Sequence, residues 1–273
     1  MTTIADAVAW LDARFPPRLA EDWDTPGLAV GDPARDLTHV MFAVDPTRDV
    51  AREAVECGAQ LLVTHHPLML RGVTTVAATS AVGAVVHALI EGGCALYAAH
   101  TNADAGRGGT NDALAQAFGM SAIAPLVADG ADAALGSGRI GTVREQTLAD
   151  FAATVAAALP PTAGGVVFAG DADAPVSRVA VVGGSGGSFW DAAVAANVDV
   201  FVTADMRHHP ATDARESARL RGGRPFLVNV SHAASESLWL SATADQLAAD
   251  LGISASVSSV NTDPWTGHVP SGR

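Results

Sequence analysis

Hydrophobic and polar positions alternate along the chain with two periods, and each period predicts a different element. Residues 4–15 place Ile4, Val8, Leu11 and Phe15 on one stripe with polar residues off it, which is typical of an amphipathic helix. Short apolar runs bounded by turn residues predict strands at 39–44, 61–64, 94–99, 139–143, 164–169, 179–182, 198–203, 226–230 and 255–260. Helices are predicted at 48–57, 80–91, 111–118, 147–159, 191–196, 211–220, 237–240 and 242–251. This order of elements indicates an α/β fold.

The pattern also predicts two similar α/β units, with mainly parallel or mixed sheets flanked by helices. His65-His66-Pro67 after one strand is echoed by His208-His209-Pro210 after another. The echo indicates duplication, and a chance resemblance between two Ala-rich halves is the alternative. We expect a first unit at 1–125, completed by the C-terminal part 226–273, and a second unit at 126–225.

Histidines and carboxylates gather where predicted strands end. The side chains at or just beyond these ends are His65, His66, His100, Asp104, His232 and Glu236. In open α/β sheets, ligands bind outside the carboxyl ends of the strands. Nitrogen and oxygen donors without sulfur suit Zn, Mn, Fe or Co in a catalytic type of site. The alternative is a scatter of polar residues at strand ends, with His100 a core histidine.

Composition excludes several classes of function. The 273 residues carry a formal charge of −13 with a pI near 4.9, which is a poor match to nucleic acid or to an anionic membrane surface. All 16 basic residues are Arg, so Schiff-base, P-loop-lysine and Ser-Lys chemistry are excluded. No apolar run approaches the roughly 20 residues of a membrane-spanning helix. We therefore expect a globular protein without membrane or nucleic-acid partners.

The cysteines bear on the expected cellular location, and one glycine-rich segment bears on nucleotide-cofactor binding. Cys57 and Cys94 have neither CxxC spacing nor a disulfide framework, and residues 1–10 lack the features of a signal peptide, so a cytoplasmic location is expected. The glycine-rich segment 183–188 follows a predicted strand and precedes a helix, as a dinucleotide-binding turn does. It lacks the G-x-G-x-x-G spacing, which argues against a nucleotide cofactor there.

Several of these segments together resemble a known family, the dinuclear-metal-centre hexameric proteins that are often named GTP cyclohydrolase 1 type 2 homologues. The segments that carry the resemblance are Trp23-Asp24 with Gly27-Leu28 and Gly31, Val63-Thr64-His65-His66-Pro67, His100-Thr101-Asn102-Ala103-Asp104, Thr203-Ala204-Asp205 with His208, and Ser231-His232-Ala233-Ala234-Ser235-Glu236. They run through nearly the whole chain in the family's order. Two positions depart from the family pattern, because Thr25 replaces an Asn and Ser231 replaces a Gly.

The resemblance implies a metal site and an assembly. The ligands that it implies, for two divalent ions per chain, are His65, His66, Asp104, His232 and Glu236. Asp104 and Glu236 would be the bridging carboxylates, and His100 would lie next to the site. The resemblance also implies a ring-shaped homo-hexamer with the metals facing an inner cavity.

Two functions are compatible with this site. The first is a metal-dependent hydrolase of a nucleotide or related compound, in which a metal-activated water is the nucleophile and His100 or His208 transfers protons. The second is a non-catalytic hexameric scaffold or metal-handling protein, which needs only the ligands and the ring. Fold and ligands do not determine a substrate, so the sequence leaves the choice open.

Overall fold

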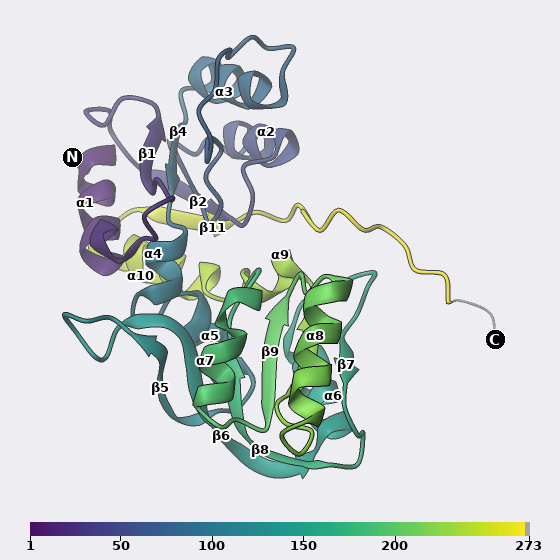
Figure 1. Ribbon diagram of the computed structural model, residues 1–273. Helices are drawn as coiled ribbons and strands as arrows, with labels where there is room; N and C mark the ends of the chain where they lie inside the picture. Colours follow the sequence, from purple (N-terminus) through teal and green to yellow (C-terminus); the bar gives the residue numbers. More distant parts are fainter. Residues whose placement is uncertain (271–273) are drawn as a thin grey trace. The chain divides into compact units, whose positions relative to one another are not determined.

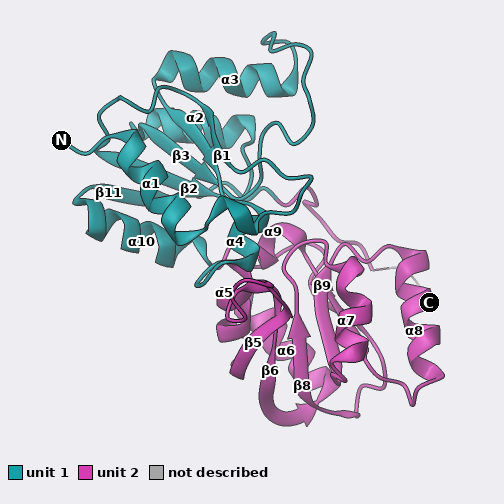
Figure 2. Ribbon diagram, turned by 60° about the vertical axis from the view of Figure 1, so that its left-hand side comes forward, with its two compact units in different colours: residues 1–109, 239–262 teal, residues 110–238, 263–273 magenta. Residues whose placement is uncertain are grey.

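Contacts within the chain divide it into two units, which Figure 2 colours separately. The structure is a computed structural model that describes residues 1–270. Unit 1 comprises Met1–Gly109 and Trp239–Thr262, and unit 2 comprises Thr110–Leu238 and the chain from Asp263 onward. Both units are mixed α/β with one sheet flanked by helices, as the sequence pattern predicts.

Unit 1 is built on a five-stranded sheet of order β1-β4-β3-β2-β11, in which only β1 is antiparallel to its neighbour. Its strands are β1 (Gly27–Val30), β2 (His39–Ala43), β3 (Leu61–Thr64), β4 (Ala95–Ala98) and β11 (Ser254–Val257). Its helices are α1 (Ile4–Arg14), η1 (Pro17–Leu19), α2 (Arg48–Glu56), α3 (Ala81–Gly92), α4 (Thr101–Ala105) and α10 (Leu240–Leu251).

Helices cover both faces of this sheet, which explains why β3 and β4 are buried along their whole length. Met41, Leu62 and Leu96 pack with side chains of α2 and α3, which lie side by side in Figure 1. On the other face, the ring of Phe42 contacts Trp239, just before α10. The predicted cap Thr47 is confirmed, since its hydroxyl accepts a hydrogen bond from Val50 N at the start of α2.

Unit 2 contains a six-stranded sheet of order β5-β6-β8-β9-β10-β7, in which β8, β9 and β10 are mutually parallel and the other pairs are antiparallel. Its strands are β5 (Ser121–Ala128), β6 (Gly136–Thr147), β7 (Val167–Ala169), β8 (Pro175–Val181), β9 (Val200–Ala204) and β10 (Phe226–Val230). Its helices are α5 (Thr110–Ala117), α6 (Leu148–Ala158), η2 (Gly187–Phe189), α7 (Trp190–Ala195), α8 (His208–Arg219) and α9 (His232–Ser235).

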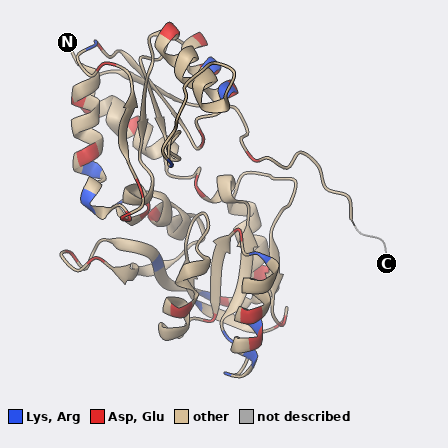
Figure 3. Cartoon of the chain, turned by 45° about the horizontal axis from the view of Figure 1, so that its top comes forward, with Lys and Arg blue, Asp and Glu red and all other residues tan. Residues whose placement is uncertain are grey.

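The alternation of side chains along β8 places two hydrophobic cores on the two faces of this sheet. Val179 and Val181 pack with α5 and α6, whereas Ala180 packs with α7 and α8. Charged residues lie on helices and loops of both units, and α8 carries both signs (Figure 3). Within residues 1–270, no helix combines the length and the apolar character that a membrane span requires.

The elements that were not predicted are the strands β1 and β5, the helices α4 and α9, and the short helices η1 and η2. β5 is largely exposed and forms through antiparallel pairing with β6, which a hydrophobic pattern cannot reveal. This pairing assigns 121–128 to unit 2, and the pairing of β10 with β9 does the same for 226–230. By its contacts, the chain passes to unit 2 after Gly109, where residue 125 was expected, and returns to unit 1 at Trp239. Residues 271–273 of the expected C-terminal part lie outside the described residues.

Candidate metal centre

Three histidines of unit 1 come together at the carboxyl ends of two parallel strands. His65 and His66 directly follow β3, and His100 follows β4, which pairs with β3 in parallel. The ring centroid of His65 lies 5.0 Å from that of His66 and 5.3 Å from that of His100. One nitrogen from each of the three rings lies within 4.8 Å of the others, so the group has the spacing to hold a metal ion.

The short helix α4 brings a carboxylate to the same group. Asp104 N bonds to His100 O at 3.1 Å, so the helical turn that follows β4 places Asp104 above His100. Asp104 Oδ1 lies 3.7 Å from Nε2 of His65, whose side chain is fully buried. The structure therefore gathers the four predicted site residues of unit 1, His65, His66, His100 and Asp104.

An oxygen acceptor holds Nδ1 of each of these histidines. The acceptor is Ala99 O for His65 at 3.0 Å, Asp45 Oδ1 for His66 at 2.7 Å and Asp24 Oδ1 for His100 at 2.9 Å. Such an acceptor favours the tautomer with the proton on Nδ1, so that Nε2 carries the lone pair. Metal-binding histidines in proteins are oriented in this way.

Asp24 is the most heavily bonded of these acceptors. Its side chain is buried and accepts hydrogen bonds from the His100 ring, from Thr101 N at 3.1 Å and from Thr101 Oγ1 at 2.5 Å. Burial raises the pKa of Asp24, but the hydrogen bonds from His100 and Thr101 outweigh it and hold the pKa well below its usual range. The Trp23 ring also contacts His100, with centroids 5.7 Å apart. Trp23 and Asp24 thus fix the orientation of His100.

In unit 2, the predicted ligands His232 and Glu236 lie together at the end of β10. His232 begins α9 and Glu236 follows four residues later, so one helical turn brings Nε2 of His232 to 3.0 Å from Glu236 Oε1. Nδ1 of His232 lies 2.7 Å from Asp205 Oδ2. Glu236 is almost completely buried, so its carboxylate lies in a low-dielectric setting beside the imidazole.

Sequence reasoning missed the roles of Asp45 and Asp205. Asp45 lies just beyond β2 and Asp205 directly follows β9, and each of these strands is the parallel neighbour of the strand whose histidine the aspartate holds. Asp205 adopts a φ of 53°, a left-handed conformation that Asp tolerates better than most residues. The sequence signal that could have identified both residues is a carboxylate at the end of the strand that is the parallel neighbour.

The two departures from the family pattern are accommodated locally. Ser231 has φ −68° and ψ 137°, which any residue adopts, so this position requires no glycine. Its hydroxyl accepts a hydrogen bond from Ala234 N and donates one to Asp263 Oδ2. Thr25 N donates to Asp24 Oδ1 at 2.8 Å, which adds one more bond to the acceptor of His100.

In the part of the chain that the structure describes, His208 belongs to no such histidine–carboxylate pair. His208 and His209 are exposed on the first turn of α8, which begins three residues earlier than predicted, and their ring centroids lie 5.1 Å apart. Within residues 1–270, the groups with metal-compatible spacing do not include His208. The sequence echo of His-His-Pro therefore corresponds to a strand end in unit 1 and to a helix start in unit 2.

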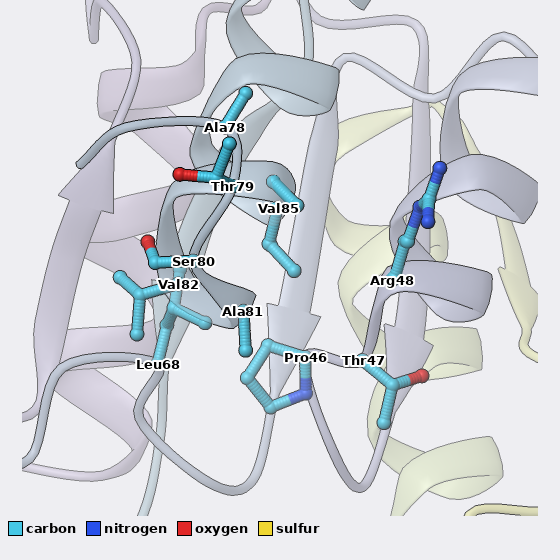
Figure 4. A pocket seen from close by; sticks show the side chains of 11 residues that line it. Pro46, Thr47, Arg48, Leu68, Ala78, Thr79, Ser80, Ala81, Val82 and Val85 are labelled. Atoms are coloured by element: carbon cyan, nitrogen blue, oxygen red, sulfur yellow. The ribbon is translucent and has the colours of Figure 1, made fainter.

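A cavity of about 480 Å³ lies in unit 1 between the starts of α2 and α3 (Figure 4). The lining residues are Pro46, Thr47, Arg48, Leu68, Ala78, Thr79, Ser80, Ala81, Val82, Ala84 and Val85. Two of its lining residues are close in sequence to the His66–Asp45 pair, since Pro46 follows Asp45 and Leu68 comes two residues after His66. The surface is mainly apolar, with Arg48 as the charged group.

Comparisons with known proteins agree with this architecture. A relative from Streptomyces coelicolor named GTP cyclohydrolase 1 type 2 homolog is 44% identical, over 99% of this chain and 96% of its own. A relative of the same name from Mycobacterium leprae is 33% identical over 96% and 94% of the two chains. A Staphylococcus aureus protein of known structure superposes with a TM-score of 0.86 at 30% identity, over 97% and 98% of the chains. The family model for Duf34/NIF3 (NGG1p interacting factor 3) matches residues 2–264, and the chain therefore belongs to the Duf34/NIF3 family.

Proposed function

We propose that this protein binds two divalent metal ions per chain and acts as a metal-dependent hydrolase on a nucleotide or a related compound. The ligands would be His65, His66 and Asp104 of unit 1, and His232 and Glu236 of unit 2. The observation that supports this most strongly is the hydrogen bond from Nδ1 of all three ligand histidines to an oxygen acceptor. All five ligands have at least two thirds of the side chain buried, and His232 is the most exposed of them at 31%.

The donor set fits a borderline or hard divalent ion such as Zn, Mn, Fe or Co, because it contains imidazole and carboxylate and no thiolate. A divalent ion bound there would supply a water of lowered pKa as a nucleophile. His100 is suited to transfer the proton, because Asp24 holds its Nδ1 and leaves Nε2 as the basic atom. His208 is the second candidate for that transfer. Arg71 and Arg107 are both exposed and would contact substrate phosphates.

The name shared by the relatives, GTP cyclohydrolase 1 type 2 homolog, favours a nucleotide as the substrate to test first. The alternative is a non-catalytic homo-hexameric scaffold that holds or handles metal. One observation favours this alternative. The cavity between the starts of α2 and α3 has a mainly apolar lining, with Arg48 as its charged group. Both proposals share the ligands and the hexamer, and they differ in whether a substrate is turned over.

The test begins with metal content. Untagged protein, reconstituted in turn with Zn, Mn, Fe and Co, should hold about two ions per chain by elemental analysis. His65→Ala and Glu236→Ala should each lower this number, whereas the control His87→Ala, on an exposed site of α3, should not. Metal near zero in every reconstituted wild-type sample would overturn the proposal.

Turnover and assembly are tested on the same samples. The loaded protein should hydrolyse GTP or another nucleotide, and His100→Ala should retain its metal while losing most of the turnover. Sedimentation should give a hexamer. Full metal occupancy with no turnover of any nucleotide would reject the hydrolase and leave the scaffold as the function.

A further inference from the structure

We propose that Gly184, in the glycine-rich turn after β8, is a positioning residue for Glu236 and His232. The absence of a side chain at this position lets the carboxylate and the imidazole lie against the backbone of the turn. This inference rests on the proposed function, in which both residues are metal ligands. It assigns a role to the segment 183–188, whose resemblance to a dinucleotide-binding turn fails on spacing.

The hydrogen bonds of this turn show what it is tied to. Three backbone N–H groups donate to side chains of other elements: Gly183 to Asn111 Oδ1 at 2.9 Å, Gly184 to Ser235 Oγ at 2.9 Å and Gly186 to Thr203 Oγ1 at 2.8 Å. A dinucleotide-binding turn instead directs such groups at a pyrophosphate. Here one of them holds Ser235, which directly precedes Glu236. The turn is therefore anchored to the segment that carries both proposed ligands.

The geometry at Gly184 requires glycine for two separate reasons. Its φ is 62°, in the left-handed region that side chains with a Cβ disfavour. A Cβ here would also overlap with Oε1 of Glu236 and lie 3.1 Å from Nε2 of His232. The colliding atom belongs to a carboxylate that is only 4% exposed and 3.0 Å from His232. The backbone of the turn is thus one wall of the space that the carboxylate occupies.

A methyl group at Gly184 should displace the ligand without unfolding the protein. Oε1 is at the end of a side chain with rotatable bonds, so the Glu236 carboxylate can turn away while the backbone stays in place. Metal affinity depends on ligand positions to a few tenths of an ångström, so this displacement should weaken metal binding. The expected signature is a large loss of affinity with a small change in thermal stability.

Gly165 provides a matched control for the backbone effect. Its φ of 58° is close to that of Gly184, but no atom lies within 4 Å of the position that a Cβ would take. Gly165→Ala therefore introduces the same left-handed strain without the collision with Glu236. A difference in metal affinity between the two alanine variants therefore measures the effect of the contact with the proposed ligands.

The experiment titrates Zn²⁺ or Mn²⁺ into the full-length metal-free protein by calorimetry, for the wild type, Gly184→Ala and Gly165→Ala. We expect Gly184→Ala to bind on the order of 10- to 100-fold more weakly, as for loss of a residue that orients ligands. Gly165→Ala should bind like the wild type, and both variants should show similar shifts in melting temperature. Equal affinities for the two variants would overturn the inference and leave the proposed function intact.

A second comparison tests whether the effect acts through Glu236. Glu236→Asp shortens the side chain by one methylene and removes the collision, so Gly184→Ala should cause little further loss of affinity in that background. An undiminished loss there would contradict the inference. If Gly184→Ala alone fails to fold, the double variant should recover folding, and failure to recover would also contradict it. A wild type that binds no metal would overturn both the proposed function and the inference.

Discussion

Oδ1 of Asp45 lies 2.7 Å from Nδ1 of His66, and the two residues come from the ends of neighbouring parallel strands, β2 and β3. Unit 2 repeats this relationship, with Asp205 at the end of β9 and His232 beyond β10 at the same distance. In both units, two neighbouring parallel strands place a carboxylate and an imidazole side by side at their carboxyl ends. This arrangement is shared by the two units, although the second His-His-Pro segment lies on a helix.

Removing the charge of Asp45 should weaken metal binding through His66. Asp45→Asn keeps the size of the side chain but loses the carboxylate that makes the imidazole more basic, so affinity should fall about 10- to 100-fold. Calorimetric titration of metal into the variant measures this change. Asp49→Asn, on the exposed face of α2, is the control and should leave affinity unchanged. Wild-type affinity in Asp45→Asn would show that this hydrogen bond does not tune His66.

Asp24 should make the stability of unit 1 depend on pH in the acid range. Its folded-state pKa is lowered by His100 and Thr101, so its stabilising effect is full above the unfolded-state pKa near 4 and is lost as the pH falls further. At pH 7, Asp24→Asn should lower the free energy of unfolding by about 2 kcal/mol, as for hydrogen bonds to a charged group. Urea titrations between pH 7 and 2 should show this difference shrinking below pH 4. A difference that stays constant with pH would rule out the ionised carboxylate as the cause.

The two cysteines should differ sharply in reactivity. Burial raises the pKa of the Cys94 thiol to about 12, whereas Cys57 is exposed after α2. Because the thiolate is the reactive form, a thiol reagent at pH 8 should modify one cysteine in the native protein and both in denaturant. Cys57→Ser should abolish the native reaction, and Cys94→Ser should leave it unchanged. Rapid modification of Cys94 in the folded protein would contradict the burial seen at β4.

The ion pair between Asp112 of α5 and Arg139 of β6 should be important for the stability of unit 2. Arg139 is 2% exposed and also donates to Gly136 O and Gly138 O, so loss of the carboxylate leaves a buried positive charge. Asp112→Ala should lower the free energy of unfolding by roughly 3 kcal/mol, measured by chemical denaturation. Asp213→Ala, at an exposed position of α8, is the control. A loss below about 1 kcal/mol in Asp112→Ala would indicate that water reaches the guanidinium.

The sequence by itself determined the alternation of strands and helices, because the central strands are mainly apolar and the helices have one apolar face. It also determined which strand ends carry imidazole and carboxylate groups, since β3 and β10 end where the polar residues begin. His65, His66, Asp104, His232 and Glu236 could be named from these patterns and the family resemblance. These features are local and depend only on residues a few positions apart.

Tertiary structure decided the rest, because it depends on pairing between distant segments. The pairing of β5 with β6 and of β10 with β9 placed these strands in unit 2, and no periodicity encodes such partners. The neighbours of the histidines, such as Asp24 for His100, lie up to 76 residues away in the chain. Gly184 has its proposed role only because β8 brings the turn against Glu236. Hydrogen bonds and close contacts depend on distance in space, which the sequence specifies only through the completed fold.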